Sequence, residues 1–278
     1  MNRTYNGLNK RQKTVVSLIF TTVFLAGVLL LGLLLSNDRL TTNLAIRNLP
    51  PSLSHPFGTD WLGRDMLTRT LKGLVVSMGV GLTAAFASVV IALGLGIMAA
   101  TMGKVVDSII SWLIDLFLSV PHLVTLILIA FVMGGGLKGV LVGLALTHWP
   151  SLARVIRAEV LQIRSSEFVH VSLRLGKSRW FIAIKHILPH LAPQFLVGLF
   201  LLFPHAILHE AAVTFLGLGL SPHQPAIGII LSESMKYLST GMWWLAFFPG
   251  LCLLIIVRLF ESLGEKLRAM ADPRHAHE

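Results

Sequence analysis

The fold is decided by a stretch without a charged residue, Gly73–Gly103, which reads GLVVSMGVGLTAAFASVVIALGLGIMAATMG. About 20 consecutive apolar residues suffice to cross the hydrocarbon core of a bilayer. Similar charge-free stretches run from Thr14 to Asn37 and from Leu116 to Leu137. Three further stretches complete a predicted set of six transmembrane helices in an all-α, polytopic membrane protein: 139–160, 191–218 and 241–260.

The overall composition supports this class of protein. The 278 residues are 54% hydrophobic and only 13% charged, with a mean hydropathy of +0.77, whereas soluble domains carry about 25% charged residues. The net charge of +10 is explained by basic loops that face anionic lipid headgroups, so we expect no nucleic-acid partner. The one cysteine, Cys252, lies in the last apolar stretch, where we expect it to serve as a small packing residue.

The distribution of Lys and Arg predicts the orientation of the chain. Six crossings put both termini on one side, and basic residues concentrate on the cytoplasmic side of a membrane. Only seven of the 23 basic residues fall on the other side: Arg39, Arg47, Arg64, Arg69, Lys72, Lys138 and Lys236. We therefore predict cytoplasmic termini. The first apolar stretch is too long for a signal peptide and lacks a small-x-small cleavage site, which predicts an uncleaved anchor and a mature chain that begins near Met1.

The sequence contains no recognisable catalytic or nucleotide-binding motif. The glycines of 134–138 join two spans and lack the strand and helix that form a phosphate-binding loop. The segment 208–213 contains a His-Glu pair without the second histidine of a zinc hydrolase. We therefore expect neither an enzyme nor a bound cofactor in this chain, which leaves transport or scaffolding as its role.

A charged segment, His55–Arg69, lies between the first two spans on the predicted external side and reads HPFGTDWLGRDMLTR. Gly58 and Gly63 are turn signals. Asp60, Arg64, Asp65 and Arg69 supply two charges of each sign, and an arginine can lock such a loop by paired hydrogen bonds to a carboxylate. This pattern favours a structural role in positioning the start of the next span.

A polar and basic segment, 167–189, interrupts the apolar stretches on the predicted cytoplasmic side. Its pattern predicts two short helices, Arg164–Leu175 and Ser178–Ile187, separated by Gly176, because glycine readily adopts the left-handed conformation that ends helices. Pro189 should limit helix growth on its N-terminal side.

The second of these short helices carries an apolar stripe at helical spacing, made of Trp180, Phe181, Ile184 and Ile187. Such a helix can insert into a groove on another protein, or rest on lipid with its tryptophan at the headgroup level. Glu167 and Arg174 lie seven residues apart on one face. They could brace the two helices, pair with a partner, or remain solvated.

Ionisable groups within the spans are candidates for a substrate pathway, because they are costly in the membrane unless paired or facing a cavity. His205 and His209 have an i, i+4 spacing that can hold a transition metal, and Glu210 lies beside them. They could instead bond to neighbouring helices or line a wet cavity, so we expect at most a transient metal contact. Asp115 lies seven residues before His122, which favours a pair between them over contact of Asp115 with substrate.

Three blocks of sequence carry a resemblance to a known family. The segment His55–Arg69 resembles the H-x-F-G-T-D-x-x-G-R-D signature of the peptide and nickel ABC-importer permeases. The segment 210–220 is similar to their E-A-A-x-S-F-L-G-L-G stretch, with Thr214 at the usual serine. The segment 167–189 resembles their EAA loop, in which Gly176, Leu188 and Pro189 keep the register while 170–172, His-Val-Ser, replaces the triplet.

This resemblance implies a fold, partners and functional residues. It implies a type I ABC-importer fold in a bacterial cytoplasmic (inner) membrane, a second similar permease, two cytoplasmic ATPase subunits that bind ATP and Mg²⁺, and an extracytoplasmic solute-binding protein. The external segment becomes a candidate contact of that binding protein, through Gly58, Asp60, Gly63, Arg64, Asp65 and Arg69. Residues 161–190 become a coupling loop to the ATPase, through Glu167, His170, Arg174, Gly176, Lys177, Arg179, Trp180, Leu188 and Pro189.

The cargo is suggested by finer details of the same resemblance. The stretches 147–157 and 208–211 look more like the nickel branch than the oligopeptide branch, and the histidine-rich tail 272–278 points the same way. We therefore predict a permease for nickel or a metal chelate, with di- or oligopeptides as the alternative and an uncoupled channel or scaffold as a third. The expected divisions are 1–72 (anchor and external loop), 73–272 (permease core) and 273–278 (tail).

Overall fold

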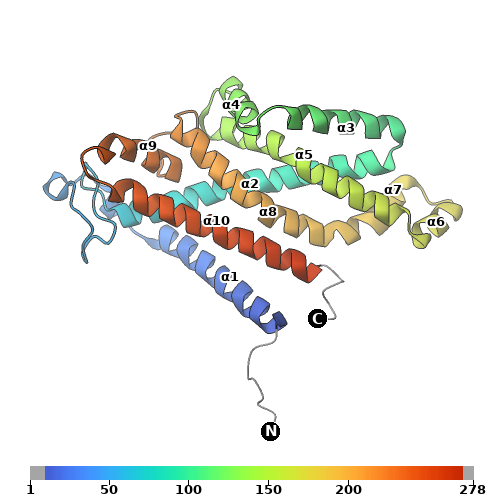
Figure 1. Ribbon diagram of the computed structural model, residues 1–278, viewed down its shortest axis with the longest axis horizontal. Coiled ribbons are helices and arrows are strands. Elements are labelled where there is room, and N and C mark those ends of the chain that lie inside the picture. Colours follow the sequence, from blue (N-terminus) through green and yellow to red (C-terminus); the bar gives the residue numbers. More distant parts are fainter. Residues whose placement is uncertain (1–9, 272–278) are drawn as a thin grey trace, which may run out of the picture.

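The computed structural model describes residues 10–271, which fold as a bundle of helices. Five long helices run roughly side by side (Figure 1): α1 (Lys10–Leu34), α2 (Met66–Thr101), α5 (Gly136–Arg164), α8 (Leu188–Phe215) and α10 (Trp244–Ala271). Shorter helices join them: α3 (Lys104–Ser119), α4 (His122–Val132), α6 (Glu167–Arg174), α7 (Arg179–Ile182) and α9 (Ile227–Leu238). Among the described residues the only β-type pairing is one bridge between Thr59 and Asp65.

Within residues 10–271, five helices are long and apolar enough to cross a membrane, and a bent pair supplies a sixth crossing if it counts as one span. The pair is α3 with α4, which meet at 97°. The expected span from Leu116 to Leu137 is therefore sharply bent, and it includes only the end of α3. The reason is Pro121, because a proline disfavours helical backbone in the residue before it, and Val120 is extended with φ −98° and ψ 140°.

The core is organised around α2, which packs against α5 and α8. Its buried positions are mostly small, including Ala84, Ala85 and Ala92, and small residues let helix backbones approach closely in a membrane. The hydroxyl of Ser88 donates to the backbone oxygen of Leu144 on α5 at 3.2 Å. Helix α2, which contains most of the charge-free stretch 73–103, thus lies at the centre of the fold.

The two ends of the bundle differ in character (Figure 1). Residues 35–65 and α9 lie at one end, whereas α6 and α7 lie at the other, toward which α1 begins and α10 ends. This arrangement agrees with the prediction that the coupling loop and both termini share the cytoplasmic side. Arg3 and Arg274, which contributed to that prediction, and the tail 273–278 lie outside the described residues.

Candidate functional site

The coupling loop (161–190) forms the end of the bundle that carries α6 and α7 (Figure 1). After α7 the chain makes a π-helical turn, Ala183–Ile187, and runs directly into α8. The stretch from Trp180 to Phe215 is therefore one continuous candidate span. Pro189 lies in the first turn of α8, so the α-helical pattern does not extend past it on its N-terminal side, as the sequence predicts. The backbone nevertheless stays helical through the π turn, in which Leu188 N–H bonds to the carbonyl of Ala183, five residues back.

Gly176 ends α6 as the sequence predicts. Its φ of +76° lies in the left-handed region that favours glycine. The N–H of Gly176 bonds to Leu173 O at 3.0 Å, and the N–H of Lys177 bonds to Ser172 O at 3.2 Å. These two bonds define a Schellman motif. Since a Cβ at Gly176 would meet nothing within 4 Å, the requirement for glycine comes from the backbone and not from crowding.

The inner face of the coupling loop is attached firmly to the bundle. Val169, Ile182 and Ile187 are buried in one hydrophobic cluster with residues of α2, α3 and α5. The Arg164 guanidinium donates to the backbone oxygen of Ala100 at the end of α2. The Ser172 hydroxyl lies 3.2 Å from His186 Nε2, which ties α6 to the π turn. A displacement of the loop must therefore be transmitted to the ends of these helices.

The outer face of the coupling loop is apolar and exposed. Leu175 is 71% exposed and Trp180 60%, and Val171 and Ile184 are also exposed. The predicted stripe is thus only partly correct, because Ile187 is buried while Trp180, Phe181 and Ile184 face outward. The π turn explains the difference, since it takes more residues per turn than an α-helix. Lys177 Nζ lies 5.1 Å from the centre of the Phe181 ring.

Most of the remaining predicted coupling residues are also exposed. Glu167, His170, Arg174, Lys177, Leu188 and Pro189 are exposed, whereas the side chain of Arg179 lies outside the described part of the structure. Within the described part, no ion pair joins Glu167 to Arg174. The possible bracing of the two short helices is carried instead by the Ser172–His186 contact.

The external segment is built around Asp60, whose side chain is fully buried. It accepts hydrogen bonds from the backbone N–H groups of Leu62 and Arg64, both at 2.9 Å. Its second oxygen receives Arg64 Nε at 2.7 Å and Arg69 Nη1 at 3.2 Å. A buried carboxylate needs such partners, and here they fold the loop 60–64 around it.

Two further contacts connect this segment to the bundle. Asp65 caps α2 by accepting from the Thr68 N–H at 2.9 Å, and it lies 3.1 Å from His55 Nδ1. Arg69 donates to Glu233 on α9. Gly63 has φ +75°, and a Cβ there would lie 1.8 Å from the Asn43 carbonyl oxygen, so the turn requires glycine. Asp60, Asp65 and Arg69 are buried and serve the loop itself, which leaves little of them for a binding protein to contact.

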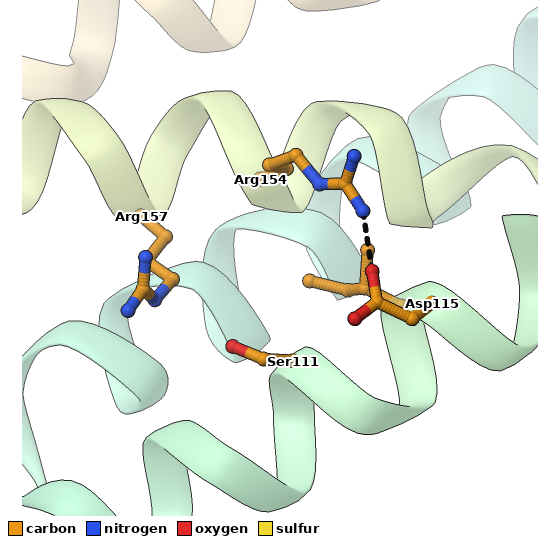
Figure 2. Close-up of a pocket in the computed structure, with 5 residues that line it drawn as sticks. Ser111, Asp115, Arg154 and Arg157 are labelled. Carbon is orange, nitrogen blue, oxygen red and sulfur yellow. Dashed lines mark hydrogen bonds and ion pairs between the residues drawn. The ribbon is translucent and has the colours of Figure 1, made fainter.

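A cavity of about 460 Å³ lies between α3 and α5, and Figure 2 shows the charged residues that line it. Arg154 Nη2 donates to Asp115 Oδ1 at 2.6 Å. The predicted pair of Asp115 with His122 is therefore wrong, because the carboxylate of Asp115 pairs with Arg154 of α5 instead. Arg157 makes a second pair across the same helices, with Nη2 2.6 Å from Asp107 Oδ2. The basic end of α5 is thus neutralised by α3.

Three histidines from three helices meet inside the bundle: His122 at the start of α4, His148 in α5 and His209 in α8. Their ring centres are separated by 4.4, 4.6 and 5.3 Å. His205 does not belong to this group; its side chain is exposed, and its backbone oxygen accepts from His209 Nδ1 at 2.8 Å. Sequence spacing could not find the cluster, because its members come from helices that meet only after folding.

Glu210, the last of the predicted pathway residues, is fully buried. One of its carboxylate oxygens accepts from the Thr214 hydroxyl at 2.9 Å. Thr214 also accepts from the N–H of Leu220 at 3.3 Å, so the pair organises the turn after α8. This geometry gives Glu210 a structural environment and does not expose it to a pathway.

Comparison with known structures identifies the fold. The fold is similar to that of a chain from inward-facing conformations of the MetNI methionine ABC transporter, with a TM-score of 0.59 and 20% identity over 74% of this chain and 98% of that one. A second crystal form of the same transporter gives the same TM-score at 18% identity. The chain thus has the type I importer fold.

The chain belongs to the family of binding-protein-dependent transport system inner membrane components, which matches residues 92–269. The dipeptide transport system permease DppC of Bacillus subtilis (strain 168) is 34% identical over 266 residues, 95% of this chain and 83% of that protein. The oligopeptide permease OppC of the same organism is 34% identical over 237 residues, 85% and 77% of the two chains. The prediction of an inner-membrane ABC-importer permease, itself not an enzyme, is confirmed.

The buried Asp60 yields a test of the external segment. Asp60→Ala should destabilise the purified protein by about 3–5 kcal/mol, because removing one partner leaves the Arg69 charge buried and underpaired. Asp38→Ala changes an exposed aspartate of the same loop whose carboxylate accepts from the nearby Ser36 hydroxyl, and it should cost far less. Thermal unfolding and the rate of proteolysis within 35–65 measure both. Equal effects of the two variants would show that Asp60 does not hold the loop.

Proposed function

We propose that this chain is the membrane permease of an ABC importer for dipeptides or oligopeptides. The observation that carries the proposal is the similarity to a dipeptide permease over 95% of the chain. An oligopeptide permease is equally similar over a shorter region. The nickel cargo expected from short stretches of sequence has no such support among these relatives, so peptide becomes the first candidate.

The proposed assembly contains a second permease, two ATPase subunits that bind ATP and Mg²⁺, and a solute-binding protein. The family description, a binding-protein-dependent transport system component, supports the last of these partners. The coupling loop supports the ATPase contact, because an exposed apolar face with neighbouring positive charge suits insertion into a groove on another protein. The competing interpretation is that this apolar face rests on the lipid surface.

The two faces of the coupling loop suggest how ATP hydrolysis would drive transport. The outer face, around Leu175 and Trp180, would move with the ATPase. The inner face, through Val169 and Ile187, is packed into the bundle. Closure of the ATPase dimer would then rock α5 and α8 between inward-facing and outward-facing arrangements, as a rigid element that shifts a two-state bundle.

Nickel or a metal chelate remains the second candidate cargo. It is favoured by one observation, the cluster of His122, His148 and His209 inside the membrane part of the protein. Imidazole nitrogen is a preferred ligand of nickel, copper and zinc.

Uptake into proteoliposomes distinguishes the two cargoes. The complete importer with its binding protein should accumulate a radiolabelled dipeptide when ATP is supplied, with or without a metal chelator. Radioactive nickel, tested alone and with a chelating ligand, should accumulate much less. Nickel uptake without peptide uptake would overturn the peptide proposal, and uptake of either cargo without ATP would favour the uncoupled channel.

Gly176 tests the coupling step. Gly176→Val forces a β-branched residue into the left-handed region, at a cost of about 1–2 kcal/mol or more, and should rearrange the end of α6. We expect at least a tenfold loss of uptake and of cargo-stimulated ATP hydrolysis.

The matched control for this variant is Gly134→Val. Gly134 also has a positive φ, +87°, with open space around it, but it lies in the turn between α4 and α5. It should retain coupling. A coupling loss as large in Gly134→Val, or full coupling in Gly176→Val, contradicts the proposed role of the loop.

A further inference from the structure

We propose that His122, His148 and His209 form a binding site for a late first-row divalent transition-metal ion, such as Ni²⁺, Cu²⁺ or Zn²⁺, within the helix bundle. The site goes beyond the proposed peptide transport, which does not require it. The three residues come from α4, α5 and α8, and each can offer a ring nitrogen to the same point.

The distances fit one ion after a small adjustment. The candidate ligand nitrogens all lie within 4.8 Å of one another. An ion about 2.0–2.1 Å from each nitrogen needs them about 3.4 Å apart in a tetrahedral arrangement. Small side-chain adjustments on binding would close the difference.

Hydrogen bonds fix which nitrogens are free to bind metal. His148 Nδ1 lies 3.0 Å from the backbone oxygen of Leu144, and His209 Nδ1 lies 2.8 Å from that of His205. A carbonyl oxygen only accepts, so in both residues Nδ1 carries the hydrogen. The Nε2 atoms of both therefore present a lone pair, and the bond on the other side of each ring orients it in the way that metal-binding histidines are held.

Three ring nitrogens of His122 and His148 are buried without partners within the described part of the chain. Among the described residues, His148 Nε2 and both ring nitrogens of His122 have no hydrogen-bond partner, and His148 is only 6% exposed. An unsatisfied buried polar atom is destabilising and demands an explanation. One metal ion in the centre would satisfy a nitrogen from each of the three residues.

The surroundings select the kind of ion. The acidic residues nearest to these histidines in the sequence, Asp115 and Glu210, do not belong to the described group of possible metal ligands. Asp115 pairs with Arg154, and one oxygen of Glu210 accepts from Thr214. The site therefore offers neutral nitrogen ligands, which suit nickel, copper and zinc, and no carboxylate oxygens of the kind that calcium and magnesium require. Three ligands leave at least one coordination position open for water or for a chelating molecule.

The test is equilibrium binding of Ni²⁺ to the purified full-length protein in detergent, followed by calorimetry, with Co²⁺ absorption spectra to report a nitrogen-rich site. The affinity tag must lack histidine, and His275→Ser with His277→Ser removes tail residues that would bind metal independently. We expect one strong site per chain and at least a tenfold weaker affinity in His148→Gln and in His209→Gln. His223→Gln, an exposed histidine in the turn after α8, serves as the control and should bind as before.

Thermal unfolding separates loss of the site from loss of the fold. Metal should raise the unfolding temperature of the parent protein and not that of His148→Gln, since a ligand stabilises only the state that binds it, while the two should unfold alike without metal. Unchanged binding in His148→Gln, or loss of binding in His205→Gln alone, would overturn the proposal in favour of another site. Because this assay needs neither ATP nor peptide, its failure leaves the peptide importer standing, and failure of peptide uptake leaves the metal site standing.

Discussion

The structure depends on one constraint, that a charge or backbone polar group without a partner is very costly in hydrocarbon. Long apolar helices satisfy the backbone, and the charged residues gather at the two ends of the bundle. At the external end Asp60 collects two arginines and two backbone N–H groups. Toward the other end Arg154 and Arg157 are neutralised by Asp115 and Asp107 on the neighbouring helix. The contacts of Asp60 give the external loop a defined shape, and the other two pairs join α3 to α5.

The apolar stretches and the two loop motifs could be predicted from sequence because they are local properties. A charge-free stretch predicts a span, and Gly176 and Gly63 predict turns, without knowledge of the rest of the fold. The bend at Pro121 could not be predicted from hydropathy, because the surrounding stretch is apolar throughout. The π turn before α8 could not be predicted either, because the apolar stripe through Ile187 is interpreted with α-helical spacing.

Contacts between helices distant in sequence could not be read from spacing. Asp115 was expected to pair with the histidine seven residues later, yet its partner is Arg154 on α5. The spacing of His205 and His209 indicates at most a transient metal contact between these two residues, yet His209 lies beside His122 and His148. The cargo was inferred from short stretches that resemble the nickel branch, whereas similarity over most of the chain favours peptides. The local sequence pattern thus predicted the helices and turns well, and the contacts between side chains of different helices much less well.

The coupling loop is the centre of this account, because one of its faces packs into the bundle and the other is exposed. The most direct measurement uses Val171→Cys, on the exposed face, in a Cys252→Ala background, with Leu53→Cys at the opposite end as the reference. Maleimide should label Val171→Cys rapidly in the isolated permease and at least tenfold more slowly when the ATPase subunits are assembled, while Leu53→Cys labels equally in both. Equal labelling of Val171→Cys with and without the ATPase would contradict the account, because the exposed face would then not be the docking surface.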